Sequence, residues 1–364
     1  MPLNATPAYD TFATRVVTWQ KQHGRHQLPW QQTRDPYRIW LSEIMLQQTQ
    51  VSTVLGYYQR FLERFPTVQA LALASQDDVM PYWAGLGYYA RARNLHRCAQ
   101  ELCTQWEGQF PRRPEQIATL PGIGRSTAAA IAAFSWGERS PIMDGNVKRV
   151  FTRYFGIYGQ PGLTATEKTL WQTADTVLQH APKQLDMTAY TQGLMDLGSM
   201  LCTRSNPNCA SCPLSTSCYA QALSVQHELP VRKTKKAVPE RHCAMLILNN
   251  QDSILLEQQP SPGIWGGLWS LPRYDDADSL RIACTHMGQH THDAQKMAPM
   301  LHVFSHFKLH IEPWLVQCHT PVLAQTDPTR SWVKIDQLTQ TALPAPVKKL
   351  LDGLYPELAN ASLA

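Results

Sequence analysis

The sequence contains no unbroken apolar run of about 18 residues, which is what a membrane-spanning helix needs. Its opening segment, MPLNATPAYD, lacks the basic and then apolar order of a secretory signal. Charged residues make up only 17% of the chain, and 33 Lys and Arg against 28 Asp and Glu give a net charge of +5 at pH 7. We therefore expect a cytoplasmic protein with no membrane partner, whose charge permits a polyanionic ligand without requiring one.

Cysteine is scarce outside one short stretch. Five of the nine cysteines are scattered, and this odd total argues against a secreted disulfide framework. The other four, Cys202, Cys209, Cys212 and Cys218, have the spacing C-x6-C-x2-C-x5-C in a polar loop that contains proline. They predict a metal centre, either tetrahedral zinc or an iron-sulfur cluster. The spacing slightly favours the cluster, because zinc sites more often show two C-x2-C pairs.

The chain is long enough, at 364 residues, for two or three domains. Residues 8–225 carry apolar side chains three and four positions apart, which predicts helices. A segment with two prolines and four basic residues follows, as is typical of an exposed linker. Beyond it, CAMLILNNQDSILLEQ predicts two apolar strands around a short polar turn, and LHVFSHFKLHIEPWLV alternates at period two over much of its length, as strands do. We expect a helical domain at 1–226, a basic linker at 227–240 and an α+β domain at 241–355.

The segment Leu120-Pro121-Gly122-Ile123-Gly124 precedes a run of small residues, STAAAIAAF. Proline and two glycines between helices form a tight hairpin, whose backbone N–H groups can approach a phosphate at the next helix N-terminus. This pattern suggests a helix-hairpin-helix motif. An ordinary glycine turn between packed helices is the commoner outcome for such a segment taken alone.

Two acidic residues are candidates for catalysis. Glu43 lies in an apolar helical stretch, and Gln47 and Gln50, four and seven residues later, are expected on the same helix face. Asp144 lies in the polar segment MDGNVKRV. A carboxyl among apolar side chains stays protonated and suits a general acid, whereas one in a polar loop stays ionised and can oppose positive charge. Each could instead be structural, with Glu43 on a helix surface and Asp144 as a helix cap.

Amide, aromatic and basic residues gather in QQTQ at 47–50 and in GLGYYARARN at 85–94. Such side chains suit contacts with phosphates and wedging between bases. A solvated helix with core tyrosines is an equally good interpretation of these two segments alone.

These motifs, in this order, resemble the endonuclease III superfamily of DNA glycosylases, and within it the adenine DNA glycosylases of the MutY family. The segments that carry the resemblance are WLSEIMLQQTQV, GLGYYARARN, LPGIGRSTAAAI, MDGNVKRV and the four-cysteine loop. The resemblance covers roughly residues 8–355. It implies an all-α helix-hairpin-helix glycosylase domain with an iron-sulfur loop, followed by an α+β Nudix-like domain. Its six-helix barrel would span about 30–138, its hairpin motif about 113–134 and its cysteine loop 202–218.

The resemblance also implies the chemistry. The target adenine would be flipped out of the duplex, because the glycosidic bond is inaccessible inside the base stack. Glu43 would protonate the departing adenine, Asp144 would stabilise the oxocarbenium-like sugar, and Asn146 would orient the site. The four cysteines would hold one 4Fe-4S cluster.

The same resemblance implies the DNA contacts. Leu46, Gln48 and Tyr88 match residues that wedge into the duplex, while the hairpin glycines Gly122 and Gly124 would grip its backbone. Superfamily members that cleave the strand carry a lysine where this chain has Ser126, and a hydroxyl cannot form the imine that such chemistry needs. We therefore predict a monofunctional enzyme, with Ser126 and the nearby Lys148 at the DNA.

In the C-terminal part, GIWGGLW at 263–269 and Phe304-Ser305-His306 match landmarks of the MutT-like domain that recognises 8-oxoguanine. Residues 267–290 lack the glutamate-rich helix of a Nudix hydrolase, so this domain should bind without hydrolysing nucleotides. The expected substrate is double-stranded DNA with adenine opposite 8-oxoguanine or guanine. The protein is expected to be a monomer, associated with the nucleoid if bacterial.

Two alternatives remain. One is a sister glycosylase acting on oxidised pyrimidines or mismatched thymine, and the other is a non-enzymatic iron-sulfur DNA-binding protein. Ser126 and the long C-terminal part count against the first, and the presence of both Glu43 and Asp144 counts against the second.

Overall fold

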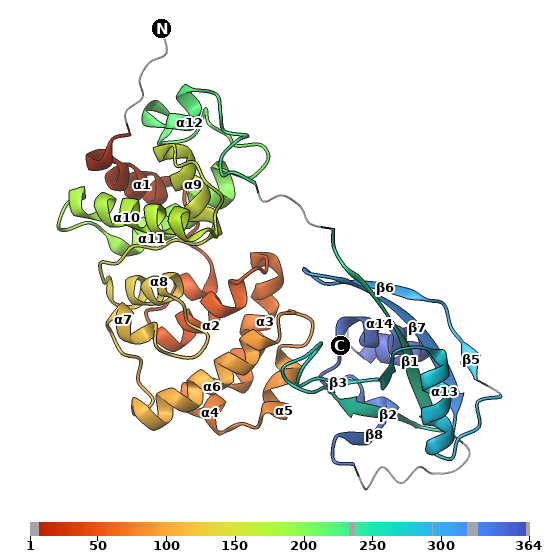
Figure 1. Cartoon of the computed structure of the whole chain (residues 1–364). Coiled ribbons are helices and arrows are strands. Elements are labelled where there is room, and N and C mark those ends of the chain that lie inside the picture. The colour runs from red at the N-terminus through yellow and green to blue at the C-terminus, as the bar shows by residue number, and fades with distance from the viewer. Residues whose placement is uncertain (1–6, 233–236, 293, 319–326, 362–364) are drawn as a thin grey trace. The chain divides into compact units, whose positions relative to one another are not determined.

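The computed structural model describes residues 7–232, 237–292, 294–318 and 327–361 (Figure 1). The chain divides into two compact units, one of residues 1–73 with 97–235 and the other of residues 74–96 with 236–364. Residues 233–236, which belong to the expected linker, lie outside the described part. Within the described part, no helix combines the length and the apolar character needed to cross a membrane.

The described residues up to 232 form helices and turns without a strand, as the spacing of apolar residues predicts. The helices are α1 (Tyr9–His23), α2 (Pro36–Leu46), α3 (Val51–Arg64), α4 (Val68–Leu73), α5 (Gln76–Val79), α6 (Ala90–Gln105), α7 (Pro114–Ile117), α8 (Arg125–Trp136), α9 (Gly145–Phe155), α10 (Thr164–His180), α11 (Met187–Asp196) and α12 (Tyr219–Ala222). A π-helical turn, η3 (Leu197–Leu201), continues α11 toward the cysteine loop.

Aspartates begin three of the helices that build the site. The side chains of Asp35, Asp144 and Asp186 accept hydrogen bonds from backbone N–H groups in the first turns of α2, α9 and α11. One expectation is wrong. Helix α2 ends at Leu46 and α3 begins at Val51, so Gln50 does not share a helix with Glu43. The backbone of Gln48 takes a left-handed conformation (φ 59°), which the α-helix does not accommodate.

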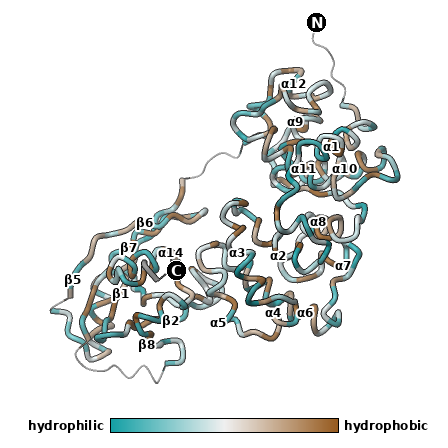
Figure 2. Tube along the Cα trace, turned by 180° about the vertical axis from the view of Figure 1, so that it is seen from behind, coloured by the Kyte–Doolittle hydropathy of each residue, from teal (hydrophilic) through white to brown (hydrophobic). Residues whose placement is uncertain are grey.

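The core of the helical unit lies between α1, α8, α9, α10 and α11, whose apolar side chains pack together. Figure 2 shows hydrophilic and hydrophobic residues alternating along these helices, as amphipathic helices require. Helix α8 contributes residues 128–133, which are five alanines and Ile131, and every one of them is fully buried. Alanines allow neighbouring helices to approach closely, and this places the N-terminal end of α8 next to the segment that leads into α9.

The C-terminal part is a mixed sheet with two helices beside it. Its strands are β1 (Glu240–Asn250), β2 (Ser253–Gln258), β3 (Trp269–Ser270), β4 (Arg273–Tyr274), β5 (Gln295–Lys296), β6 (Met300–Val303), β7 (Lys308–Gln317) and β8 (Arg330–Lys334). Its longer helices are α13 (Ala277–His286) and α14 (Ala345–Leu354), and α15 (Pro356–Ala361) follows.

The expected β1–β2 pair is present, and the alternating stretch 301–316 forms two strands, β6 and β7. Strands β1 and β2 are antiparallel through a two-residue turn, with Asn250 opposite Ser253. Strands β6 and β7 are also antiparallel, with Val303 opposite Lys308, while β1 and β7 pair in parallel at the centre of the sheet. The β6–β7 turn therefore presents residues 304–307 at a sheet end.

Candidate active site

Glu43 lies in the last turn but one of α2 and is half-buried. Burial of the carboxyl, and in second place the negative charge of Asp144, raise the pKa of Glu43 to about 8. The two carboxyls predicted to act together are therefore close enough to influence each other's ionisation. At neutral pH, Glu43 is mostly protonated and can donate a proton.

Asp144 caps a helix, which is the structural role that the sequence offered as the alternative to catalysis. Its side chain caps α9 by accepting a hydrogen bond of 2.7 Å from the backbone N–H of Val147. Burial raises the pKa of Asp144, while hydrogen bonds from Val147 and Asn146 and the cation of Arg149 act to lower it. These contacts stabilise the ionised form and fix the carboxylate beside Glu43.

Asn146 is held from two sides. Its side-chain oxygen accepts a hydrogen bond of 2.9 Å from Nη2 of Arg149. Gly198 in η3 lies so close to Asn146 that a Cβ atom on Gly198 would come within 2.5 Å of the asparagine Cβ. Arg149 also donates to the carbonyl of Cys202 at 2.6 Å and to that of Gly198. No sequence pattern marks Arg149 as part of the site, although it lies only five residues after Asp144.

Ser126 supports the segment that leads into Asp144. Its hydroxyl oxygen accepts a hydrogen bond of 3.0 Å from the N–H of Met143, the residue before Asp144. Lys148 forms an ion pair with Glu167, with 2.8 Å between Nζ and Oε1. The lysine therefore has a partner within the protein fold.

The predicted hairpin has an exposed tip. Leu120 and Ile123 are buried and anchor it, whereas Gly122 and Gly124 are exposed. Gly122 has a φ of 76°, which favours glycine. Gly124 directly precedes α8, and no atom lies within 4 Å of where its Cβ would be. The backbone here is open to a ligand at the helix N-terminus.

The three predicted wedge residues differ in their surroundings. Leu46 ends α2 and is half-buried, whereas Gln48 is exposed in the turn that follows. Tyr88 is 46% exposed and belongs to the other unit, just before α6. Gln48 and Tyr88 both have positive φ values, 59° and 50°, which are uncommon outside glycine and cluster at functional sites.

The four predicted metal ligands line one small cavity, together with Arg153 and Gln226. None of the four is in a disulfide. Among the described residues, no group of three or more His, Cys, Asp or Glu side chains is arranged to hold a single metal ion. The cysteines thus share a cavity but are not gathered around one point.

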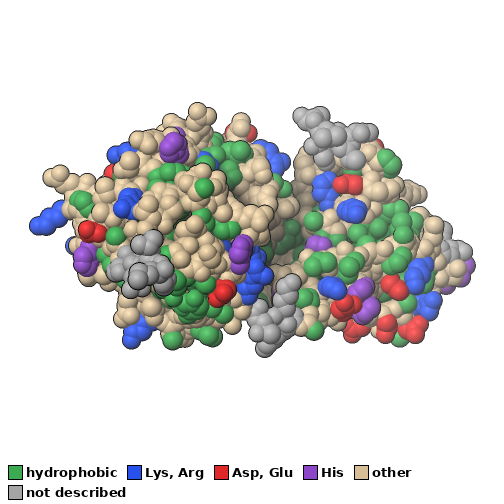
Figure 3. Space-filling model, turned by 90° about the horizontal axis from the view of Figure 1, so that it is seen from above, with side chains coloured by type: hydrophobic (Ala, Val, Ile, Leu, Met, Phe, Trp, Pro, Cys, Tyr) green, Lys and Arg blue, Asp and Glu red, His purple; other side chains and the backbone are tan. Residues whose placement is uncertain are grey.

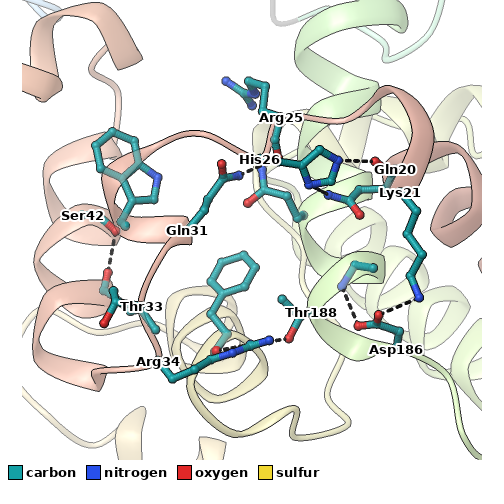
Figure 4. A pocket seen from close by; sticks show the side chains of 15 residues that line it. Gln20, Lys21, Arg25, His26, Gln31, Thr33, Arg34, Ser42, Asp186 and Thr188 are labelled. Atoms are coloured by element: carbon teal, nitrogen blue, oxygen red, sulfur yellow. Dashed lines mark hydrogen bonds and ion pairs between the residues drawn. The ribbon is translucent and has the colours of Figure 1, made fainter.

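A second cavity, of about 260 Å³, lies between α2, α11 and the segment after α1 (Figure 4). Trp30, Gln31 and Gln192 line it, as does Ile39 of α2. Glu43 follows Ile39 by four residues and so lies one turn further along the same face of α2. No sequence pattern predicts this cavity, because its walls come from segments more than 150 residues apart.

Phe304, Ser305 and His306 form the tight turn between β6 and β7, which the N–H of Phe304 closes by donating to the carbonyl of Phe307 at 2.9 Å. Phe304 is half-buried and stacks on Phe307 with ring centroids 4.3 Å apart. Ser305 and His306 are exposed. Trp265 lies beside Phe304 at 5.9 Å, so the two sequence landmarks of this domain are in contact.

Two family models match the chain. Residues 41–175 match the HhH-GPD superfamily of base excision DNA repair proteins, and residues 243–353 match the NUDIX domain. An adenine DNA glycosylase of Buchnera aphidicola (subspecies Acyrthosiphon pisum) is 34% identical over 345 residues, which cover 94% of this chain and 97% of that protein. The chain belongs to the adenine DNA glycosylases. The human adenine DNA glycosylase is 28% identical over 411 residues, which cover 93% of this chain and 73% of the human protein.

Solved structures agree on the fold of the helical part. A thermostable thymine-DNA glycosylase superposes with a TM-score of 0.52 at 28% identity, covering 58% of this chain and 96% of that one. Endonuclease III from a non-covalent DNA complex superposes with a TM-score of 0.50 at 20% identity, covering 60% and 97%. The predicted fold class is therefore confirmed: this adenine DNA glycosylase is a multidomain base-excision repair enzyme, with an endonuclease III-like helical domain and a C-terminal NUDIX domain.

Proposed function

We propose that the protein is a monofunctional glycosylase that excises adenine mispaired with 8-oxoguanine or guanine in double-stranded DNA. The observation that carries this proposal is the pair of coupled carboxyls, Glu43 with a pKa of about 8 and the capping residue Asp144. Two carboxyls with different environments can divide the roles of acid and anion at neutral pH.

In this mechanism the duplex releases the adenine from its stack, and the base enters the cavity beside α2. The carboxamides of Gln31 and Gln192 and the ring of Trp30 line that cavity, and such groups suit a heterocycle with donors and acceptors on its edge. Protonated Glu43 donates its proton to N7 of adenine, which makes the base a better leaving group. The glycosidic bond then breaks and both of its electrons leave with the base.

The sugar that remains carries positive charge. The carboxylate of Asp144, oriented by α9 and Asn146, opposes this charge until water adds to the sugar. Because Ser126 offers a hydroxyl in place of an amine, no imine forms and the strand stays intact. Lys148 is proposed as a DNA contact, although in the free protein its ammonium is paired with Glu167.

Cys202, Cys209, Cys212 and Cys218 are proposed to hold one 4Fe-4S cluster. The four cysteines line one small cavity, and thiolates are the usual ligands of such a cluster. When bound, the cluster would cross-link residues 202–218 through four thiolate-iron bonds.

The NUDIX domain is proposed to recognise 8-oxoguanine through Phe304, Ser305 and His306, with an aromatic ring available for stacking. The hairpin at Gly122 and Gly124 is proposed to bind the DNA backbone, and Leu46, Gln48 and Tyr88 to wedge into the duplex. The proposed domains are residues 1–226, 227–240 and 241–355. The protein is proposed to act as a monomer in the cytoplasm, at the nucleoid if bacterial.

Single-turnover cleavage of labelled duplexes tests this function. Adenine opposite 8-oxoguanine is compared with thymine glycol and with a G:T mismatch, each with and without alkali. We expect breakage at the adenine only, and only after alkali. Breakage at a pyrimidine would support the sister class instead, and breakage without alkali would show that an amine such as Lys148 acts as a lyase.

A further inference from the structure

Arg153 is a charged side chain buried inside the helical unit. It lies on α9 and is only 3% exposed. Its Nε donates to the carbonyl of Leu229 at 2.9 Å, and its Nη1 donates to that of Thr203 at 2.8 Å. Nη2 donates to the carbonyl of Arg204 at 3.3 Å. The guanidinium thus joins α9, the cysteine loop and the chain just before residue 230.

One contact of Arg153 is with a predicted metal ligand. Nη1 lies 3.2 Å from Sγ of Cys202, within hydrogen-bonding distance of a sulfur. The contact continues in the other direction, since Sγ of Cys218 lies 3.6 Å from the carbonyl oxygen of Arg153. A single residue therefore meets the sulfurs of the first and the last cysteine of the loop.

The charge of Arg153 has no carboxylate to balance it. Within the described residues, no Asp or Glu forms an ion pair with Arg153, although less buried arginines such as Arg25 and Arg330 do form them. Its partners are carbonyls and one sulfur. A buried cation without an anion is costly, so such groups are normally paired. The anion that this site lacks can be supplied by the cysteine loop, because four thiolates around an iron-sulfur core carry net negative charge.

We propose that Arg153 is the positioning residue of the metal centre, supplying the buried positive charge and the N–H donor to Cys202 that hold the cluster in its oxidised and reduced forms. The inference rests on the cluster part of the proposed function. Hydrogen bonds to cluster sulfurs and nearby charge both set the reduction potential. A cation and a donor favour the more negative, reduced state, so Arg153 raises this potential.

Gln226 provides a weaker contact of the same kind. Its Nε2 lies 3.9 Å from Sγ of Cys209, and the side chain carries no charge. It is only partly buried. The two residues therefore allow a graded comparison, with a larger effect expected at Arg153 than at Gln226.

The experiment uses the full chain purified with its metal and compares Arg153→Lys, Arg153→Met and Gln226→Leu with wild type. The matched control is Arg139→Met, because Arg139 also donates to backbone carbonyls, those of Pro182 and Ala181, but contacts no sulfur. Three quantities are measured: iron per chain, the rate at which a chelator removes iron, and the reduction potential of the cluster by voltammetry. Circular dichroism reports whether each variant folds.

We expect Arg153→Met to lose iron more than tenfold faster than wild type and Arg153→Lys several-fold faster, with the potential of both below that of wild type. Gln226→Leu should change the rate of iron loss and the reduction potential less than the Arg153 variants do, and Arg139→Met should change neither. The inference is overturned if either Arg153 variant, shown by circular dichroism to be folded, matches wild type in both iron loss and potential. Should Arg153→Met fail to fold, Arg153→Lys still decides. Wild-type protein without iron would instead refute the cluster.

Discussion

The two parts of the molecule place their candidate functional residues in opposite environments. In the helical part, Glu43 and Asp144 are half-buried, and burial raises the pKa of both. In the sheet part, Ser305 and His306 stand exposed on a two-strand turn, with Phe304 beside them in an aromatic cluster. Proton transfer benefits from a desolvated acid, whereas recognition of a partner's surface needs side chains that can reach it.

The distribution of acids supports the same contrast. Helix α13, which follows the glycine-rich landmark of the NUDIX domain, contains a single acidic residue, Asp278. Its side chain is 86% exposed and paired with Arg281. Nothing in α13 offers the clustered carboxylates that bind a hydrolytic metal ion. We therefore expect the helical part to carry the chemistry and the sheet part to bind.

The distribution of Lys and Arg on the surface gives no comparable contrast between the two parts. On the face shown in Figure 3, Lys and Arg side chains are scattered among polar and apolar ones and form no continuous basic stripe. Affinity for DNA is thus expected to come from local features, such as the open backbone at Gly124, together with dispersed phosphate contacts.

The largest effect is expected from Glu43→Gln. The amide fits the same space but cannot donate a proton to the base, so the single-turnover excision rate should fall by about 10²–10⁴-fold. DNA affinity, measured by fluorescence anisotropy, should change little. Glu63→Gln, on the exposed face of α3, is the matched control. An active Glu43→Gln protein would remove the general-acid role and with it the contrast between the two parts.

The sheet part is tested by Phe304→Ala. Loss of one stacked ring should cost about 1–3 kcal/mol of recognition. We expect the preference for adenine opposite 8-oxoguanine over adenine opposite guanine to fall roughly tenfold, with excision opposite guanine unchanged. Leu301→Ala, which removes a 53% exposed side chain from β6, controls for damage to the hairpin. Equal losses on both substrates would mean that the hairpin supports the fold rather than specificity.

The pH profile tests the coupled carboxyls directly. Because Glu43 must be protonated, the excision rate should stay level up to about pH 8, where its pKa lies, and fall about tenfold per unit above it. Because Asp144 must be ionised, the rate should also fall in acid, at a pH above the usual range of an aspartate. Single-turnover rates from pH 4 to 10 provide the measurement. If the rate of Lys148→Met still falls at alkaline pH, Lys148 is not the cause of that fall.

Much of this arrangement could be predicted from sequence, for reasons that are local. Helix periodicity, the glycine hairpin and the β1–β2 pair depend on neighbouring residues, and the structure confirms them. The end of α2 was misjudged, because apolar spacing continues past Leu46 while the backbone of Gln48 does not stay helical. The roles of the catalytic and DNA-binding residues came from family resemblance and stay predictions.

What the sequence could not show depends on distant segments. The cavity of Trp30 and Gln192, the contact of Gly198 with Asn146 and the Arg153–Cys202 hydrogen bond each join residues about 50 to 160 positions apart. No local pattern marks such pairs. The ion pair of Lys148 with Glu167 joins residues that are closer in the chain, but no sequence pattern marks Glu167 as the partner.

The smallest expected effect concerns stability. Folding raises the pKa of Glu43 from 4.5 to about 8, so the fold favours the protonated carboxyl. Below pH 4.5 the carboxyl of Glu43 is protonated in the folded and the unfolded chain alike, so its ionisation does not lower the free energy of unfolding. As pH rises from 4.5 to 8 the unfolded chain ionises first, and the free energy of unfolding falls by up to roughly 1.4 kcal/mol per pH unit.

Glu43→Gln removes this penalty. The variant should therefore melt within about 1 °C of wild type at pH 5 but a few degrees above it at pH 8.5. Scanning calorimetry of the full chain at both pH values gives the comparison, with Glu63→Gln expected to show no difference at either. If the difference in melting temperature between Glu43→Gln and wild type were the same at both pH values, Glu43 would be solvated like a surface acid. The burial of Glu43, which distinguishes it from the exposed residues of the sheet part, would then be wrong.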